Sequence, residues 1–394
     1  MWRHGPCAGE AQQDVIPWSE MTSKDPKSHK KKRAGVFGFL FGSWLNVLLV
    51  FVPISLSIEP LGLPRIWAFV FSALAIVPLA GLIGQATEEL AHWVGPGIGG
   101  LMNATFGNAT ELIISILALQ AGLQSVVKAS LVGSIIGNIL LVLGASMLVG
   151  GWGREKQTFN RTRVSASASM LFLAAVALVM PAIYDLAVFG SLRQRGPSIE
   201  ELSILVAAVL LATYLAGLVF SLRTHRDLIT GAPGDAGAAR LSPAESVLLL
   251  FAATAVVAVE SDLLVSGIQE ATSALGMTEF FVGVIVVAVV GNAAEHASAV
   301  MMALRNRMEL AVAIAAGSST QVALFVAPVL VFASVLMGSP MTLVFNIFEV
   351  VGLALSVIAV SLITLDGESN WFEGAQLLAV YLVLAIVFYF VPPA

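Results

Sequence analysis

Two short segments of the sequence share a pattern of polar side chains inside long apolar runs. The first reads GNATELI over 107–113 and the second reads GNAAEHA over 291–297. Each has an asparagine followed three residues later by a glutamate, a spacing that places both side chains on one face of a helix. A carboxylate in the hydrocarbon core of a membrane costs about 2.5 kcal/mol or more. Carrying this cost twice predicts a function for Glu111 and Glu295; the alternative is a buried structural carboxylate bonded to a neighbouring helix.

An offset of 184 residues relates the two segments and continues beyond them. It places Gly133 on Gly317 without a gap, and the serine that follows each glycine on its counterpart. With a rise of 1.5 Å per helical residue, the polar residues after these glycines reach about the depth of the glutamates. We therefore predict one site built from both halves of the chain. Its predicted cation-binding residues are Glu111, Glu295, Asn108 and Asn292, and its predicted lining residues are Gly107, Gly291, Ser134, Asn138, Ser318 and Gln321.

Carboxylate, amide and hydroxyl oxygens give this predicted site an all-oxygen character and two negative charges. Ca²⁺ takes six to eight oxygen ligands in a flexible geometry, whereas zinc and copper sites more often contain Cys or several His. The chain has one Cys, Cys7, and five His, of which only His296 lies at the depth of the site. Without a cation, two facing carboxylates in a low dielectric are expected to take up protons. Protons and a divalent cation would then compete for Glu111 and Glu295.

The composition indicates the environment in which such a site must be held. Hydrophobic residues make up 58% of the chain and charged residues only 11%, whereas a soluble domain carries about 25% charged residues. Apolar windows of about 20 residues, the length of a membrane-spanning helix, recur along the whole sequence. We predict an all-α polytopic membrane protein with about eleven transmembrane helices. The predicted spans are 37–58, 64–84, 98–121, 128–150, 163–187, 201–221, 245–268, 279–303, 309–337, 340–364 and 374–392.

Basic residues are distributed unevenly among the loops between these spans. Of the 20 Lys and Arg residues, 16 lie on one side and four on the other. The 16 lie in the N-terminal tail, in 151–163, in 222–244 and at Arg305 and Arg307; the four are Arg65, Lys128, Arg193 and Arg195. Since Lys and Arg concentrate in cytoplasmic loops, we predict a cytoplasmic N-terminus and a C-terminus on the opposite side.

The repeat and the span count together predict an inverted architecture. After the first span, ten spans remain as five plus five, and an odd number of spans per half inserts the second half upside down. Inverted repeats with a site at the membrane midplane are a recurrent design of secondary transporters. The predicted organisation is a disordered cytoplasmic tail (1–36), an extra N-terminal transmembrane helix (37–58), a first five-helix repeat (64–221), a cytoplasmic linker (222–244) and a second, inverted five-helix repeat (245–392).

The two motifs also carry a family resemblance. Together with VGSIIGNILLVLG (132–144) and AGSSTQVALFVAP (316–328), they resemble the calcium/proton exchanger (CAX) family of the cation/calcium exchanger superfamily. The resemblance runs from about residue 60 to the C-terminus. It implies an antiporter that moves Ca²⁺ out of the cytosol against entering protons, with Glu111 and Glu295 as Ca²⁺ ligands and Asn108 and Asn292 beside them. An acidic segment between the halves, present in some relatives, is not visible in 222–244.

The resemblance also implies further proton-linked acids, with one departure. ATEEL (86–90) resembles a family stretch in which an acidic residue helps proton exchange, which points to Glu88 or Glu89. Where the family usually has a glutamate in its seventh span, this chain reads ESDLLV, with Asp262 in that position and Glu260 nearby. The predicted proton-linked residues are Glu111, Glu295, His296, Glu88, Glu89 and Asp262.

Each of these additional residues has a simpler structural interpretation that stays open. His296 is either a proton-sensitive neighbour of the site or a hydrogen-bonding residue that orients Glu295. Glu88 and Glu89 fit interfacial charges at a helix end equally well, and an ion pair could account for Asp262. The sequence does not decide among these interpretations.

The predicted function is therefore secondary active Ca²⁺/H⁺ antiport by alternating access, without enzymatic activity or a cofactor. The predicted partners are Ca²⁺, protons and membrane lipid, but not nucleic acid. The alternatives are exchange of Na⁺, K⁺, Mn²⁺ or Mg²⁺ for protons, Na⁺/Ca²⁺ exchange by the same fold and, more remotely, an ion channel or an intramembrane hydrolase. The predicted location is a bacterial inner membrane with a cytoplasmic N-terminus, and a vacuolar membrane would impose the same physics.

Overall fold

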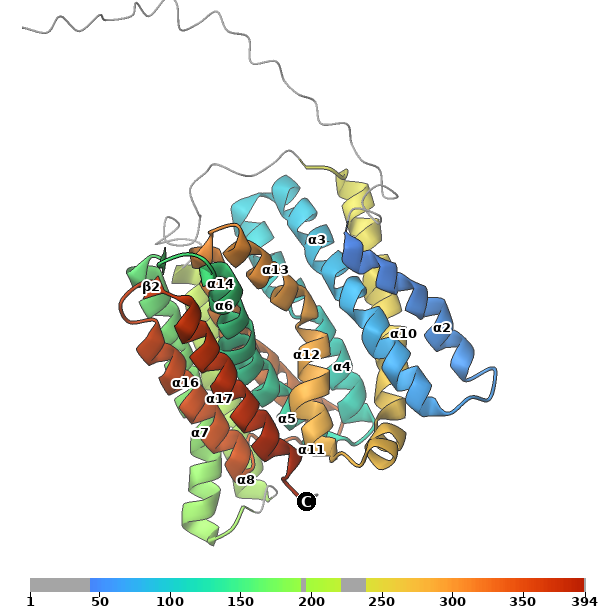
Figure 1. Ribbon diagram of the computed structural model, residues 1–394. Coiled ribbons are helices and arrows are strands. Elements are labelled where there is room, and N and C mark those ends of the chain that lie inside the picture. Colours follow the sequence, from blue (N-terminus) through green and yellow to red (C-terminus); the bar gives the residue numbers. More distant parts are fainter. Residues whose placement is uncertain (1–42, 193–195, 221–238, 393–394) are drawn as a thin grey trace, which may run out of the picture. The chain divides into compact units, whose positions relative to one another are not determined.

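The computed structural model describes residues 43–192, 196–220 and 239–392, which are helical apart from one small sheet (Figure 1). That sheet pairs β1 (Gln157–Thr158) with β2 (Glu368–Ser369) in antiparallel register. The predicted tail (1–36) and most of the predicted linker (222–244) lie outside the described residues.

The first half of the described chain contains a 3₁₀ helix and seven α-helices. They are Trp44–Val50 (3₁₀), α2 (Phe51–Ile58), α3 (Arg65–Phe106), α4 (Ala109–Gln120), α5 (Gln124–Ile136), α6 (Leu143–Gly151), α7 (Arg161–Phe189) and α8 (Pro197–Val219). The second half contains α10 (Pro243–Leu275), α11 (Glu279–Phe281), α12 (Ala288–Gly291), α13 (Ala293–Leu304), α14 (Met308–Gln321), α15 (Ala327–Leu336), α16 (Ile347–Ile363) and α17 (Trp371–Tyr389). Three π-helical turns connect consecutive helices, at Gly137–Val142, Val282–Val287 and Val322–Val326.

Within the described ranges, seven helices are long and apolar enough to cross a membrane, and a pair bent by 60° (Glu279–Gly291 with Ala293–Leu304) makes an eighth candidate. Three shorter apolar helices, Trp44–Ile58, Ala109–Gln120 and Ile347–Ile363, accompany them. These helices follow the predicted spans in order. The all-helical class with multiple apolar spans is therefore confirmed, whereas the count of eleven stays a prediction.

Helix boundaries differ most from the prediction around the first motif. The second predicted span, 64–84, is too short, because the helix that begins at Arg65 runs on to Gly95, whose φ of 82° interrupts it. The third, 98–121, is not one helix. Asn108 has φ −106° and ψ 18°, so that α3 ends before it and α4 begins after it. A periodicity argument cannot see this break because the apolar pattern continues through it.

Two further predictions are corrected at the other end of α5. Lys128 was assigned to a loop outside the membrane, but it lies within α5 and is only 6% exposed. Its Nζ donates hydrogen bonds to Thr342 Oγ1 (3.3 Å) and Val344 O (3.0 Å). The predicted span 340–364 begins too early, since helix α16 starts at Ile347, where Asn346 and Glu349 form a capping box. The apolar residues before it are buried as extended chain rather than as helix.

The offset of 184 residues reappears as matching helix boundaries. Helix α4 shifted by 184 gives the bounds of α13, and the first residue of α5 gives that of α14. Asn108 and Asn292 each separate two helices, with ψ values of 18° and 12°. Both α5 and α14 continue into a π-helical turn. Similar local sequences have therefore formed the same local structure twice.

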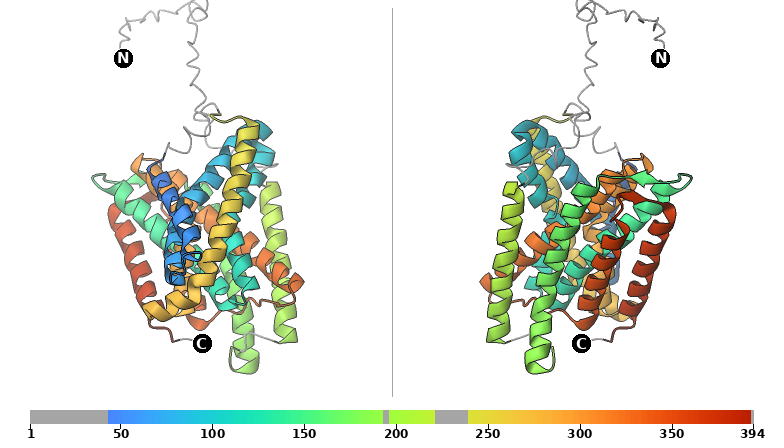
Figure 2. Two further views of the ribbon diagram at one scale, coloured as in Figure 1. Left: turned by 90° about the vertical axis from the view of Figure 1, so that its right-hand side faces the viewer. Right: turned by 90° about the vertical axis from the view of Figure 1, so that its left-hand side faces the viewer.

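The helices of the N-terminal part pack around α10. Helix α3 lies along α10, and α2 contacts both of them (Figure 1). The left view of Figure 2 shows α2 in dark blue beside α10 in yellow. Elsewhere α6 packs tightly on α17 through two glycines, since a Cβ on Gly144 would lie 3.0 Å from Gly374 O. The main apolar core surrounds α5, α14 and their π-helical turns.

Candidate cation-binding site

The break before α4 places Glu111 in the first turn of that helix. The side chain is 8% exposed, and neither carboxylate oxygen has a hydrogen-bond partner among the described residues. Buried polar groups are almost always hydrogen-bonded, because an unpaired buried group costs free energy. Two unpaired carboxylate oxygens in one buried side chain therefore indicate a ligand that this side chain is arranged to bind.

Glycine 291 of the second motif lies directly against this carboxylate. A Cβ added at Gly291 would lie 3.2 Å from Glu111 Cγ and 3.7 Å from Glu111 Oε1. The absence of a side chain at position 291 thus leaves the space that Glu111 occupies. The first motif supplies the carboxylate, and the glycine of the second motif leaves the space that this carboxylate fills. The sequence indicated only that the two segments are alike.

Amide and hydroxyl groups connect the two halves around this contact. The Asn292 Nδ2 donates to Ser134 Oγ (2.8 Å), and its Oδ1 accepts from Asn138 Nδ2 (3.0 Å). The same Asn138 amide lies 3.1 Å from Ser318 Oγ. On the other side, Asn108 Nδ2 donates to Gln321 Oε1 (2.6 Å). Each of these bonds joins a residue of the first half to one of the second.

A small cavity opens beside Glu111. Its volume is about 10 Å³, which is room for about one water molecule. Its polar lining consists of Glu111, Ser115, Ser130 and Ser134, and the remaining lining residues are Gly291, Ile114, Leu131, Val287 and Val322. A space of this size has room for a single small ion.

Two of these lining residues, Ser115 and Ser130, were missed in the sequence. The signal was present, because Ser115 follows Glu111 by four residues and Ser130 precedes Ser134 by four, so that each pair shares a helix face. A lone serine in an apolar helix is common, however, and often bonds only to its own backbone. Only the cavity distinguishes these two from the others.

The second glutamate occupies the matching place but a different environment. Glu295 lies in the first turn of α13 and is half-buried rather than buried. The neighbouring His296 has a buried Nε2 with no hydrogen-bond partner among the described residues. The repeat thus gives the two glutamates matching positions at the start of a helix without making their surroundings equal.

No group of three or more His, Cys, Asp and Glu side chains is placed to hold a metal ion in the described part of the chain. A cation bound beside Glu111 and Glu295 would therefore need hydroxyl, amide or backbone oxygens as its remaining ligands. Hard cations such as Ca²⁺ accept such ligands readily.

Substitution of Gly291 by alanine is expected to reduce cation binding by about tenfold or more without unfolding the protein. The methyl group would meet Glu111 Cγ at 3.2 Å and displace the carboxylate, and disturbing the orientation of a metal ligand costs about 10–100-fold in affinity. Gly317→Ala is the matched control, since a Cβ there meets nothing within 4 Å. Binding titrations on both variants make the comparison, and equal affinities would contradict the assigned contact.

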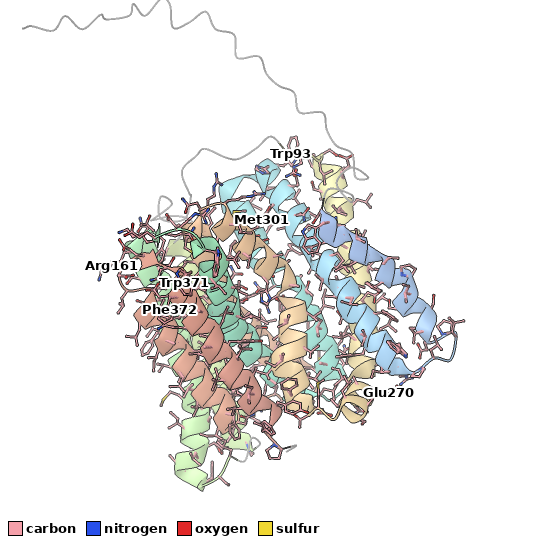
Figure 3. All side chains as sticks on the ribbon, viewed as in Figure 1. Trp93, Arg161, Glu270, Met301, Trp371 and Phe372 are labelled. Carbon is pink, nitrogen blue, oxygen red and sulfur yellow. The ribbon has the colours of Figure 1, made fainter. Side chains whose placement is uncertain are left out.

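The remaining predicted proton-linked residues lie elsewhere. Glu89 is buried and accepts hydrogen bonds from the backbone N–H groups of Arg240 (2.8 Å) and Leu241 (3.2 Å). Trp93, labelled in Figure 3, donates from Nε1 to the oxygen of Leu241 (3.2 Å). Glu88 is exposed, and so is Asp262 on α10. The structure therefore does not bring Glu88, Glu89 or Asp262 into the cavity.

Replacing Glu89 by alanine is expected to lower the free energy of unfolding by about 1–3 kcal/mol, because the N–H groups of Arg240 and Leu241, which precede α10, lose their acceptor. Glu88→Ala is the control and should change stability by about 0.5 kcal/mol or less, since its side chain is exposed. Thermal unfolding in detergent measures both. A larger loss in Glu88→Ala than in Glu89→Ala would refute the structural role of Glu89.

The chain is similar to one protein family, to curated proteins of that kind and to a solved structure. The model of the family described as sodium/calcium exchanger protein matches residues 64–223 and 245–390. The chain is 44% identical over 360 residues to a Ca(2+)/H(+) antiporter of Aphanothece halophytica, covering 88% of this chain and 96% of that protein. It is 43% identical over 345 residues to the Ca(2+)/H(+) antiporter ChaA of Bacillus subtilis, covering 86% and 96%. The solved structure of native YfkE superposes with a TM-score of 0.76 at 40% identity, covering 89% of this chain and all of that one.

Proposed function

Because the chain belongs to the sodium/calcium exchanger protein family, we propose that it is a Ca²⁺/H⁺ antiporter whose two motif glutamates bind Ca²⁺ and protons in alternation. The similar proteins named Ca(2+)/H(+) antiporters support the choice of ions. A transport function also means that the chain is not an enzyme, that it needs no cofactor, and that Ca²⁺ and H⁺ are its substrates. The observation that carries the site assignment is the buried, unpaired carboxylate of Glu111 packed on Gly291.

The chemistry of exchange follows from competition for the same oxygens. A bare carboxylate in a dry cavity is unstable, so Glu111 is held either as the neutral acid or as a ligand of a cation. Binding of Ca²⁺ beside both glutamates replaces their protons, and protonation of both removes the negative charges that hold Ca²⁺. Each ion therefore releases the other. As a net result, Ca²⁺ and protons cross the membrane in opposite directions, and neither moves without the other.

Alternating access needs two states that expose the site to opposite sides of the membrane. The matching helix boundaries of α4 and α13 at an offset of 184 support an organisation in two repeats. We propose that the repeats are inverted, that about eleven spans cross the membrane, and that the N-terminus is cytoplasmic. With Lys128 removed from the loop count because it is buried, the basic residues favour this orientation more strongly.

The remaining proton-linked assignments stay proposals with different support. The buried, unpaired Nε2 of His296 beside Glu295 favours a role at the site. The hydrogen bonds of Glu89 favour a structural role for that residue. The location is a membrane, and we propose a bacterial plasma membrane, as the bacterial relatives suggest, although vacuolar proteins are also among the similar sequences.

Uptake of radiolabelled Ca²⁺ into proteoliposomes with an imposed pH gradient tests the proposal. Antiport predicts uptake that depends on the gradient and collapses when an ionophore dissipates it. Uptake that ignores the gradient would indicate a channel instead. Competition by Na⁺, K⁺, Mn²⁺ and Mg²⁺ in the same assay identifies the transported cation, and a requirement for Na⁺ in place of the pH gradient would identify Na⁺/Ca²⁺ exchange.

A further inference from the structure

A third acidic side chain is buried in the apolar interior, away from the cavity beside Glu111. Glu260 has no exposed surface. It lies 17 residues after the first residue of α10 and 15 before the last. At 1.5 Å per residue it is roughly 26 Å and 23 Å from the two ends of the helix. Glu260 thus occupies the middle of a span, where ionisable side chains are costly and rare.

The partner of Glu260 comes from the N-terminal helix. Ser55 of α2 is also fully buried, and its Oγ lies 2.9 Å from Glu260 Oε1. The other carboxyl oxygen, Oε2, is buried and has no hydrogen-bond partner among the described residues. An ionised carboxylate accepts up to about four hydrogen bonds, so that a single hydroxyl contact leaves it far from satisfied.

The single hydroxyl proton of Ser55 indicates that Glu260 is protonated and neutral. The Ser55 Oγ also lies 2.8 Å from its own backbone acceptor, Val52 O. A serine hydroxyl has one proton to donate and two lone pairs to accept with. If Ser55 donates to Val52, the contact with Glu260 is a hydrogen bond only when Glu260 is protonated and donates to Ser55. Both short contacts are then satisfied by two protons, one on each side chain.

In the part of the chain that the structure describes, the helices packed on α10 place no charged group beside Glu260 that could hold it ionised. Helix α2 contains no titratable residue, and α11 contributes only Glu279. On α3, Arg65 is the first residue, and Glu88, Glu89 and His92 lie near the start of α10, where Glu89 accepts from Arg240 N and Leu241 N; α4 carries only Glu111. On α10 itself, Glu245 lies in the first turn and Glu270 near the last, where it accepts from Arg65 N (2.9 Å) (Figure 3). Asp262 is exposed, about 200° around the helix from Glu260.

We propose that Glu260 is a proton-binding site separate from Glu111 and Glu295, which holds a proton while Ser55 of α2 is seated against it and releases that proton during the exchange cycle. This inference rests on the proposed proton-coupled function. Release would leave a bare carboxylate in an apolar interface, so it requires water to reach the contact between α2 and α10. Helix α10 packs on α3 and α4, and the Glu111 carboxylate begins α4. A movement of α10 that follows a change of protonation at Glu260 can therefore reach the cation site through the contact between α10 and α4.

The first test is spectroscopic and does not depend on transport. Infrared spectra of the purified protein at neutral pH should contain a carbonyl band of a protonated carboxyl group that disappears in Glu260→Gln. The same band should shift in Ser55→Ala, which removes the partner, and stay in place in Ser57→Ala. Ser57 is the matched control because it lies on the same helix, is exposed and donates only to Pro53 O. Spectra in which Glu260→Gln removes no such band would overturn the proposal.

The second test separates proton release from packing. In proteoliposomes, Glu260→Gln should slow Ca²⁺ uptake driven by a pH gradient by about 100-fold, the lower end for loss of a positioned proton-transfer group. Exchange of external labelled Ca²⁺ for internal Ca²⁺ needs no proton movement and should stay within about twofold of the unmodified protein. If both activities are intact, or both fall together, Glu260 does not release a proton in the cycle. If the unmodified protein shows no pH-driven uptake, the proposed function itself has failed, a distinguishable result.

Discussion

Glu111→Gln is expected to lower Ca²⁺ uptake driven by a pH gradient by about 100-fold or more, and Glu295→Gln should do the same. Loss of residues that only orient a metal ligand already costs about 10–100-fold in affinity, and these residues are proposed to be the ligands themselves. Glutamine keeps the size of the side chain but removes one of the two negative charges and the exchangeable proton. Radiolabelled Ca²⁺ uptake in proteoliposomes measures the loss.

The two glutamates differ in burial, and this difference predicts how Glu111→Gln affects the fold. Glu111 is buried and packed on Gly291, whereas Glu295 is half-buried. Glu111→Gln should therefore leave the fold intact, because a neutral amide is easier to bury than a carboxylate. Glu270→Gln is the control, since the new side chain can still accept from Arg65 N and lies at the end of α10. Transport that persists in Glu111→Gln at the level of this control would refute the assignment of the site.

Gly133→Ala is expected to cost about 3 kcal/mol or more of stability, the upper end for overpacking a well-packed interior. A Cβ at this position would overlap the backbone carbonyl of Val284, in the π-helical turn that crosses α5. A backbone group of another helix cannot move aside as a flexible side chain can. The whole contact between α5 and this turn would have to open. Thermal unfolding of the purified protein in detergent measures the change.

Gly137→Ala provides the matched control, four residues further along the same segment. A Cβ there meets nothing within 4 Å, so its effect should be close to zero or slightly favourable through the higher helix propensity of alanine. Similar melting temperatures for Gly133→Ala and the unmodified protein would show that α5 and the turn at Val284 do not pack as closely as the structure has them.

The local sequence predicts the chemistry of the site, and that assignment stays a prediction. The pairs Asn108 with Glu111 and Asn292 with Glu295 were recognised by their spacing, and all the predicted lining residues on the following helices fall around them. The amides of Asn138 and Asn292 and the hydroxyls of Ser134 and Ser318 form one network. Their depth could be calculated because a helix has a constant rise per residue.

Helix ends were less predictable than helix identities. The break at Asn108 interrupts no apolar pattern, and the helical stretch from Arg65 to Gly95 runs eleven residues past the predicted end of its span because the polar ATEEL segment remains helical. Lys128 was counted among the outer loop residues because it stands at the start of the predicted span 128–150. Its burial depends on two acceptors, Thr342 and Val344, that are more than 200 residues away in the sequence.

The sequence by itself determined that this is a helical membrane protein, that two related segments carry one acid each, and that oxygen ligands with two negative charges suit a divalent cation. These are properties of composition, spacing and local chemistry. Only the tertiary structure decided that Gly291 makes room for Glu111, that Ser115 and Ser130 line the cavity, and that Glu260 rather than Asp262 is buried in α10. The physical reason is that burial and hydrogen bonding depend on which helix faces which, and contacts between distant segments leave no periodic signal in the chain.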